Sequence, residues 1–232
     1  MKCILIIGGA NDIGNALAES FVNLGYQVVI GYHNHLPLDK NFDCHKCDVT
    51  KECDIQETIE YCLDKYQHID ILLNLANLNQ DNSFLNKTKD EFMRVLEVNL
   101  VGTFLLNQYY SRYIDNGMIL NMASTDGLDT GSTYSIDYSA SKSGIITMSK
   151  IIASATNNKV YCLCPNWISS DSTNSMNKEY LESELTRINQ SRLITINELI
   201  TSINDIINSN YDSGSVFRID IKDDKLWMKK IS

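Results

Sequence analysis

The chain has 232 residues, of which 44% are hydrophobic, and its 20 basic and 29 acidic side chains give a formal net charge of −9. This length and apolar fraction suffice for one large α/β domain with a substantial core, and they exclude a chain that is disordered throughout. The negative charge argues against a nucleic-acid partner, and no apolar run approaches the roughly 20 residues that would indicate a membrane partner.

The first nine residues resemble a secretory signal peptide only superficially. Their apolar stretch is short and runs into Gly8 and Gly9 instead of a cleavage site. The seven cysteines are odd in number, and a chain of this size needs no disulfides, so we expect reduced thiols in a cytoplasmic protein. Cys44-x-x-Cys47 beside His45 lacks the second half of a zinc motif, and we therefore predict no metal site.

Apolar, strand-like runs alternate with helical patterns along the whole chain. We predict strands over residues 2–7, 27–32, 45–48, 69–75, 118–123, 159–164 and 215–221. We predict helices over residues 12–24, 54–66, 89–113, 136–155 and 195–208, the last opened by a capping box from Thr195 to Glu198. Such alternation is typical of a parallel sheet covered on both faces. The prediction is an α/β fold: a single doubly wound Rossmann-type domain over residues 1–232, with a parallel seven-stranded sheet, helices on both faces and a charged C-terminal extension over residues 221–232.

Glycines between the first strand and the first helix indicate a nucleotide site. Gly8 and Gly14 frame a turn in which the backbone can approach a phosphate, while the helix N-terminus offers N–H groups and a favourable dipole. We expect the dinucleotide to contact Gly8, Asn11, Asp12, Ile13 and Gly14. Asp12 stands where a third glycine would be expected. Its carboxylate could repel a pyrophosphate, or it could cap the helix with its charge aimed away, and the sequence leaves both readings open.

The end of the second predicted strand bears on which dinucleotide binds. An acidic residue there would hold a ribose 2′-hydroxyl and select NAD. The chain has Tyr32-His33-Asn34-His35 instead, which removes the repulsion against a 2′-phosphate. We therefore expect NADP to be favoured over NAD, with Tyr32 and His33 in the site. Asp48, after the third strand, could bond an adenine amino group, cap the next helix or lie in a solvated turn.

Tyr138 and Lys142 are four residues apart in a predicted helix and therefore lie on one face of it. An ammonium group near a phenol favours the phenolate, which lowers the tyrosine pKa from its usual value of about 10. The pair could then donate or accept a proton near neutral pH. Tyr-x-x-x-Lys often arises by chance, but here Ser124 lies fourteen residues before Tyr138, just after an apolar run.

In their order along the chain, these motifs resemble the classical short-chain dehydrogenases/reductases. The resemblance implies an NAD(P)-dependent oxidoreductase that transfers a hydride between the nicotinamide and a carbonyl or secondary alcohol of a small substrate. It implies that Tyr138 is the general acid/base and that Ser124 donates a hydrogen bond to the substrate oxygen. It further implies that Lys142 binds the nicotinamide ribose and that Asn99 helps to hold a water connecting Lys142 to solvent. The remaining cofactor contacts that it implies are Asp48, Val49, Asn74, Ala76, Tyr138, Lys142, Pro165, Ile168 and Ser170.

Several positions depart from the family pattern. Asp12 replaces a glycine, Leu75 and Asn77 alter the usual Asn-Asn-Ala-Gly run, and Asn166 replaces the glycine after Pro165. None of these departures touches the four expected catalytic positions. They nevertheless leave an alternative open, in which the chain is a non-catalytic dinucleotide-binding sensor of the same fold.

Within the family, the pattern is most similar to the 3-oxoacyl-carrier-protein reductases, which we keep as an alternative function. Carrier proteins are acidic, and their docking would be opposed by the net charge of −9 and by Asp115 before the fifth strand. We therefore expect a free small carbonyl or alcohol substrate, with residues 169–190 as a lid and Trp167 and Tyr180 lining the cleft. Because the family commonly forms tetramers and the helices 89–113 and 136–155 are apolar beyond one stripe, we expect a homodimer or homotetramer.

Overall fold

A twisted sheet forms the centre of the computed structural model, which describes residues 1–37 and 42–232. Eight strands of the described chain pair in the order β3-β2-β1-β4-β5-β6-β7-β8. The first seven run parallel, and β8 pairs antiparallel with β7. Their bounds are β1 (Cys3–Ile7), β2 (Gln27–Tyr32), β3 (Asp43–Lys46), β4 (Ile71–Asn74), β5 (Met118–Met122), β6 (Lys159–Pro165), β7 (Val216–Lys222) and β8 (Lys225–Lys230).

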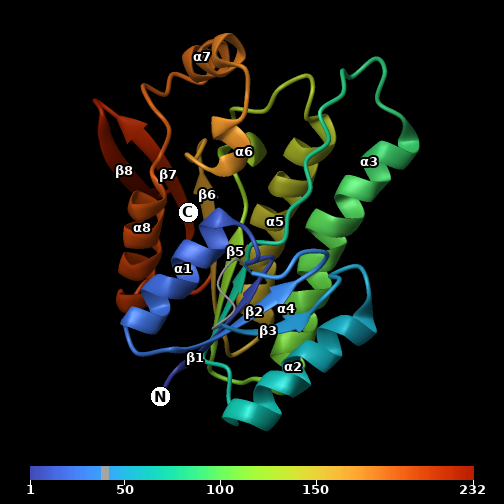
Figure 1. The fold of residues 1–232 in the computed structure, drawn as a ribbon, viewed down its shortest axis with the longest axis vertical. Coiled ribbons are helices and arrows are strands. Elements are labelled where there is room, and N and C mark those ends of the chain that lie inside the picture. The colour runs from blue at the N-terminus through green and yellow to red at the C-terminus, as the bar shows by residue number, and fades with distance from the viewer. Residues whose placement is uncertain (38–41) are drawn as a thin grey trace.

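Helices cover both faces of this sheet, α1 and α8 on one and α2, α4 and α5 on the other (Figure 1). The short helices α6 and α7 lie beyond the carboxyl ends of the strands, at the top of Figure 1. In the described chain none of the helices is long and apolar enough to cross a membrane. Their bounds are α1 (Asp12–Asn23), α2 (Glu52–Tyr66), α3 (Lys89–Leu96), α4 (Gly102–Tyr113), α5 (Ile136–Ala155), α6 (Asp171–Asn174), α7 (Lys178–Arg187) and α8 (Ile196–Asn208), with a π-helical segment at Glu97–Val101 and a 3₁₀ turn at Thr125–Gly127.

The first strand illustrates why these sequences form a doubly covered sheet. Every residue of β1 is buried. Ile4 and Ile6 face the core under α1 and α8, whereas Leu5 and Ile7 face the core under α2 and α4. A strand that buries both faces has to be apolar throughout, because successive side chains point to opposite sides.

The strand order reverses at β1, which lies between β2 and β4. At such a switch point the loops that leave the two neighbouring strands diverge to opposite faces and open a crevice at the carboxyl end of the sheet. The glycine turn after β1 and the loop after β4 both begin there. The fold therefore predicts a ligand site at this edge.

The predicted α/β class, the parallel strands and the helices on both faces are confirmed, as is the capping box from Thr195 to Glu198. The strand count differs: the sheet has eight strands instead of seven. Asp223 and Asp224 have φ angles of 48° and 60°, which form a tight two-residue turn, and the charged residues after it return along β7 as β8. The predicted helix over residues 89–113 is present but contains the π-helical segment.

Candidate active site

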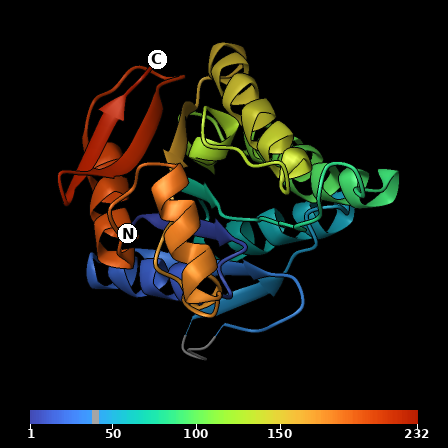
Figure 2. The ribbon, with the colours of Figure 1, turned by 90° about the horizontal axis from the view of Figure 1, so that it is seen from above.

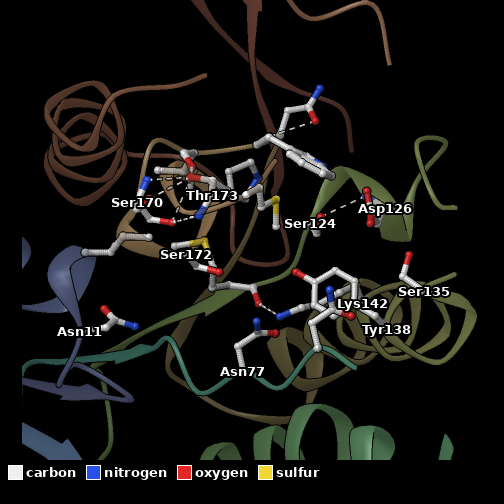
Figure 3. Close-up of a pocket in the computed structure, with 18 of the residues that line it drawn as sticks. Asn11, Asn77, Ser124, Asp126, Ser135, Tyr138, Lys142, Ser170, Ser172 and Thr173 are labelled. Carbon is white, nitrogen blue, oxygen red and sulfur yellow. Dashed lines mark hydrogen bonds between the residues drawn. The ribbon is translucent and has the colours of Figure 1, made fainter. Parts of the chain in front are cut away.

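A cavity of about 580 Å³ opens at the carboxyl ends of the central strands. The first turn of α1 forms one wall, and the loops after β4 and β5 together with Tyr138 and Lys142 of α5 form another. Residues between Pro165 and Thr173 and the helix α7 also line the cavity. In Figure 2, α7 lies over the carboxyl ends of the strands. Figure 3 shows the side chains that project into it, with Asn11 and Ser170 at one end and Tyr138 and Ser124 at the other.

Two glycines allow the turn after β1 to pack this closely. Gly8 has a φ of +74°, and a Cβ on it would lie 2.7 Å from the backbone N of Ala76. A Cβ on Gly14 would lie 2.3 Å from the Cα of Gly9. The side chain of Asn11 caps α1, because its Oδ1 accepts the N–H of Gly14 at 2.8 Å. Only glycine fits the two framing positions, and the helix N-terminus is thereby brought to the cavity wall.

Asp12 uses its carboxylate in a way that the sequence did not predict. Its Oδ2 accepts the backbone N–H of Asp171, the first residue of α6, at 2.6 Å. The carboxylate thus connects the first turn of α1 to the segment above the cavity. The structure adds this third role to the two predicted alternatives, and Asp12 also lines the cavity.

Tyr138 and Lys142 meet on one face of α5, as their spacing predicts. The Nζ atom of Lys142 lies 5.2 Å from the centroid of the Tyr138 ring and donates to the carbonyl of Met122 at 3.0 Å. The lysine is 1% exposed, and this burial lowers its pKa to about 8. The pKa of Tyr138 is raised, by burial first and by the carboxylate of Asp126 second, against a lowering hydrogen bond from Ser124. The predicted lowering of the tyrosine pKa is therefore not found, because burial and the carboxylate of Asp126 outweigh the hydrogen bond from Ser124.

Ser124 follows β5 and is almost fully buried on the cavity wall. Its Oγ accepts the backbone N–H of Asp126 at 3.1 Å (Figure 3). The carboxylate of Asp126 accepts a hydrogen bond from the hydroxyl of Thr130 at 2.8 Å, and burial raises its pKa. Asp126 is not among the predicted site residues. Its position two residues after Ser124, beyond the end of a strand, was the signal that could have pointed to it.

Asn99 lies in the π-helical segment and is fully buried. Its Nδ2 donates to the carbonyl of Leu78 at 2.9 Å and to the Oγ of Ser141 at 3.1 Å, while its Oδ1 accepts the N–H of Leu78 at 2.7 Å. Asn99 does not line the cavity; it connects the loop after β4 to the residue before Lys142. Single π turns within helices often occur at functional sites.

The residues predicted for the adenosine side lie outside this cavity. Asp48 accepts hydrogen bonds from the backbone N–H and hydroxyl of Thr50 at 3.1 and 2.7 Å. Its Oδ2 lies 3.5 Å from Nε2 of His33 and 3.4 Å from Nζ of Lys51. Burial opposes the charge on Asp48, but these hydrogen bonds and neighbouring cations keep its pKa below the ordinary value. Asp48 therefore forms a local turn with Thr50, and two basic side chains lie beside it.

The end of β6 and the residues that follow it form another part of the cavity wall. Pro165, Ile168 and Ser170 line the cavity, and the departure Asn166 accepts the N–H of Trp167 on its Oδ1 at 3.0 Å. Among the predicted site residues, the structure brings nine to the cavity: Asn11, Asp12, Ile13, Ser124, Tyr138, Lys142, Pro165, Ile168 and Ser170. The predicted residues that do not line it are Gly8, Gly14, Tyr32, His33, Asp48, Val49, Asn74, Ala76 and Asn99.

Asn74 is one of the residues outside the cavity, and its side chain holds the loop after β4 that lines the cavity. It is buried, donates to the hydroxyl of Thr103 at 2.8 Å and accepts the N–H of Ala76 at 3.1 Å. Val49 is also buried and packs against Gly102 of α4. In the described part of the chain, His, Cys, Asp and Glu side chains form no group that could hold a metal ion.

Comparisons with known proteins agree with this geometry. A family model described as short chain dehydrogenase matches residues 2–181. The chain is 30% identical to the 3-oxoacyl-[acyl-carrier-protein] reductase of Thermotoga maritima, over 94% of this chain and 96% of that protein. It is 27% identical to the human protein of the same name, with the same coverage. A solved short chain dehydrogenase from Leptospira borgpetersenii with bound NAD+ superposes with a TM-score of 0.83 at 26% identity, over 94% of this chain and 91% of that one.

Proposed function

Because this chain belongs to the short-chain dehydrogenases and is an NAD(P)-dependent oxidoreductase, we propose that Tyr138, Ser124 and Lys142 catalyse the interconversion of a carbonyl and an alcohol in a small substrate. The observation that carries this proposal is the meeting of a phenol, a hydroxyl and a buried lysine on the wall of one cavity. The same cavity extends to the N-terminus of α1, so one ligand can reach both ends.

The residues present fit a nicotinamide dinucleotide. The glycine turn leaves no room for a Cβ at Gly8 or Gly14, as expected where the backbone must approach a phosphate closely. When bound, the dinucleotide supplies the hydride that the carbonyl carbon gains, and the nicotinamide is oxidised. We propose that the residues holding it are Gly8, Asn11, Asp12, Ile13 and Gly14 at the pyrophosphate, Tyr32, His33, Asp48, Val49, Asn74 and Ala76 on the adenosine side, and Tyr138, Lys142, Pro165, Ile168 and Ser170 at the nicotinamide end.

The proposed proton chemistry follows from the surroundings of each group. A raised pKa keeps Tyr138 protonated at neutral pH, so it can donate its proton to the oxygen of a carbonyl as the alcohol forms. Ser124 accepts the N–H of Asp126, and its own hydroxyl is within hydrogen-bond reach of Tyr138, so it can donate to a substrate oxygen held beside the phenol. Lys142 donates one N–H to Met122 and has others to direct toward the ribose. Asn99 donates a hydrogen bond to Ser141, the residue before Lys142, and so helps to hold this face of α5.

We propose NADP as the preferred dinucleotide. No acidic residue ends β2, and His33 and Lys51 flank Asp48 with cationic or hydrogen-bonding nitrogens. Titrations of NADPH and NADH followed by nicotinamide fluorescence test this preference. The dissociation constant for NADPH should be the smaller one, and it should rise when Lys51→Ala removes one of the two basic groups. An equal or tighter fit of NADH would reject the proposal.

The catalytic assignment is tested by Tyr138→Phe. This variant should lose carbonyl reduction by at least a hundredfold, since acid–base catalysis is typically worth about 10² to 10⁴, while it still binds NADPH. Tyr134→Phe is the matched control, because Tyr134 is an exposed phenol just before α5 and does not line the cavity. Parental turnover by Tyr138→Phe would show that the phenol has been assigned the wrong role.

A 3-oxoacyl-carrier-protein reductase is the second candidate, favoured by the activity named for the Thermotoga relative. A free 3-oxoacyl ester and the same acyl group on its carrier protein distinguish the two, because only a carrier-dependent enzyme would prefer the second by a large factor.

We also propose that the enzyme is a cytoplasmic homodimer or homotetramer. Apolar side chains on the π-helical segment, α4 and α5 support the assembly, since Val101, Phe104 and Ile151 are between 44% and 62% exposed. Light scattering coupled to gel filtration measures the mass directly. A monomer at micromolar concentration would contradict this part of the proposal.

A further inference from the structure

The part of the cavity beyond Ser124 and Tyr138 is lined by acidic side chains. Asp81, Asp126 and Glu184 all face it, and Arg187 is the basic residue beside them. The guanidinium of Arg187 is already bonded to Glu184, with Nε and Nη2 at 3.0 and 2.8 Å from the same carboxylate oxygen. Its charge is therefore compensated. Asp81 and Asp126 form no ion pair with the described residues, although Arg187 still attracts the carboxylate of Asp126 from a distance.

Asp126 is the one closest to the proposed chemistry. Its N–H is bonded to Ser124 at 3.1 Å, which fixes the aspartate beside the hydroxyl that would hold the reacting oxygen. Its Oδ1 accepts the hydroxyl of Thr130, while Oδ2 accepts no hydrogen bond from the described residues. The carboxylate also raises the pKa of Tyr138, so its field reaches the phenol. A substrate held by Tyr138 and Ser124 would therefore lie beside an acceptor oxygen.

We propose that Asp126 accepts a hydrogen bond from a hydroxyl group of the substrate, and that the substrate is a hydroxylated carbonyl compound of the sugar or polyol class. This inference rests on the proposed oxidoreductase function. It narrows the substrate to one that carries a hydroxyl near its reacting carbonyl, because the acceptor lies beside the residues assigned to the reacting oxygen.

The neighbouring side chains favour a hydroxyl over other polar groups. A carboxylate or phosphate on the substrate would be repelled by Asp81 and Asp126. An ammonium group would be attracted by them but would face Lys142, which is still protonated at neutral pH. Asn77, Ser132 and Ser135 also line the wall, and their amide and hydroxyl groups both donate and accept. A hydroxyl group does both as well.

Three methyl ketones of nearly equal size test the inference. Hydroxyacetone, 2-butanone and aminoacetone differ only in the group next to the carbonyl carbon, and their kcat/KM values are compared with NADPH in excess. The parent enzyme should prefer hydroxyacetone to 2-butanone by tenfold or more, and to aminoacetone as well. In Asp126→Asn the preference over 2-butanone should fall by about tenfold, since hydrogen bonds to charged groups contribute roughly twice as much as neutral ones.

Asp129→Asn is the matched control, because Asp129 is in the same loop but is exposed, paired with Arg218 and absent from the cavity wall. Its hydroxyacetone preference should equal that of the parent. Equal or better use of 2-butanone or aminoacetone by the parent would overturn the inference and leave the oxidoreductase in place. Failure to reduce any carbonyl compound despite NADPH binding would instead overturn the proposed function, and the inference with it.

Discussion

The Nζ atom of Lys87 lies 2.9 Å from Oδ2 of Asp137, with the two side chains 3% and 0% exposed. Asp137 directly precedes Tyr138, and Lys87 closes the loop that carries Asn77 and Asp81 on the cavity wall. Lys87 also donates to the carbonyl of Gln80 in the same loop. One buried ion pair thus connects the loop that carries Asn77 and Asp81 to the first turn of α5, the helix that contains Tyr138.

Lys87→Met should destabilise the protein by about 3 to 5 kcal/mol, because it leaves the carboxylate of Asp137 buried without its partner. Adding Asp137→Asn should restore much of this loss, since no charge then remains in the interior. Urea denaturation at pH 7 measures both. The control is Lys89→Met, which removes an exposed lysine two residues away. A loss below about 1 kcal/mol for Lys87→Met would mean that the ion pair contributes little.

The sequence was sufficient for the central sheet because buried parallel strands need continuous apolar runs, which β1 and β6 supply. It was insufficient for β8. Leu226 and Met228 pack against the core while the lysines around them stay exposed, so the apolar signal of this strand is short. The turn before it is Asp223-Asp224, which lacks the glycine that usually marks a two-residue hairpin turn.

The candidate site, like the sheet, was predictable from the sequence only in part. Spacing along one helix predicted that Tyr138 and Lys142 would meet, but not that burial would raise the tyrosine pKa. Motif order predicted Asn99, whereas its bonds to Leu78 depend on a loop 21 residues away. Asp126 belongs to no fixed motif, and its place two residues after Ser124 does not show that its side chain reaches the cavity wall. Local patterns fix which residues share a helix face; desolvation and long-range contacts are set by the whole fold.

Deleting residues 223–232 should destabilise the protein and promote association. The deletion exposes the backbone N–H and C=O groups of β7 as an open edge. It also removes the Trp227 ring, whose centroid lies 3.4 Å from Nζ of Lys222. We expect a lower melting temperature and light scattering that grows with protein concentration. Asp223→Asn combined with Asp224→Gly is the control, because it keeps a turn suited to positive φ; if the deletion melts like this control, β8 is dispensable.

Lys142 should make stability depend on pH in a direction opposite to that of an ordinary stabilising lysine. Its pKa is about 8 in the folded protein, whereas that of an unperturbed lysine is 10.5, so the unfolded chain binds more protons between these values. The contribution of Lys142 to the free energy of unfolding therefore increases as pH rises through 8, and the increase is complete near pH 10.5. Relative to Lys142→Met, the parent should gain about 2 kcal/mol between pH 7 and pH 9.5.

Urea denaturation of both proteins across this pH range measures the difference. Buried thiols such as Cys3 and Cys47, whose pKa values burial raises, act in the opposite direction but are shared by both proteins and cancel. Lys150→Met, which removes an exposed lysine of the same helix, is the control. A difference that is flat or that shrinks with rising pH would show that Lys142 keeps an ordinary affinity for its proton.

Asp12 should hold the segment above the cavity in place. Its Oδ2 accepts the N–H of Asp171 at 2.6 Å, on an exposed part of the structure where such a bond contributes about 1 kcal/mol. Asp12→Ala should therefore speed amide hydrogen exchange in residues 169–176 by about fivefold, whereas Asp12→Asn keeps an acceptor oxygen and should stay close to the parent. Mass spectrometry of the peptides covering this segment measures the rates. Asp90→Ala, in the exposed first turn of α3, controls for the loss of a carboxylate elsewhere. Unchanged exchange in Asp12→Ala would mean that other contacts, such as the capping of α6 by Ser170, hold the segment without Asp12.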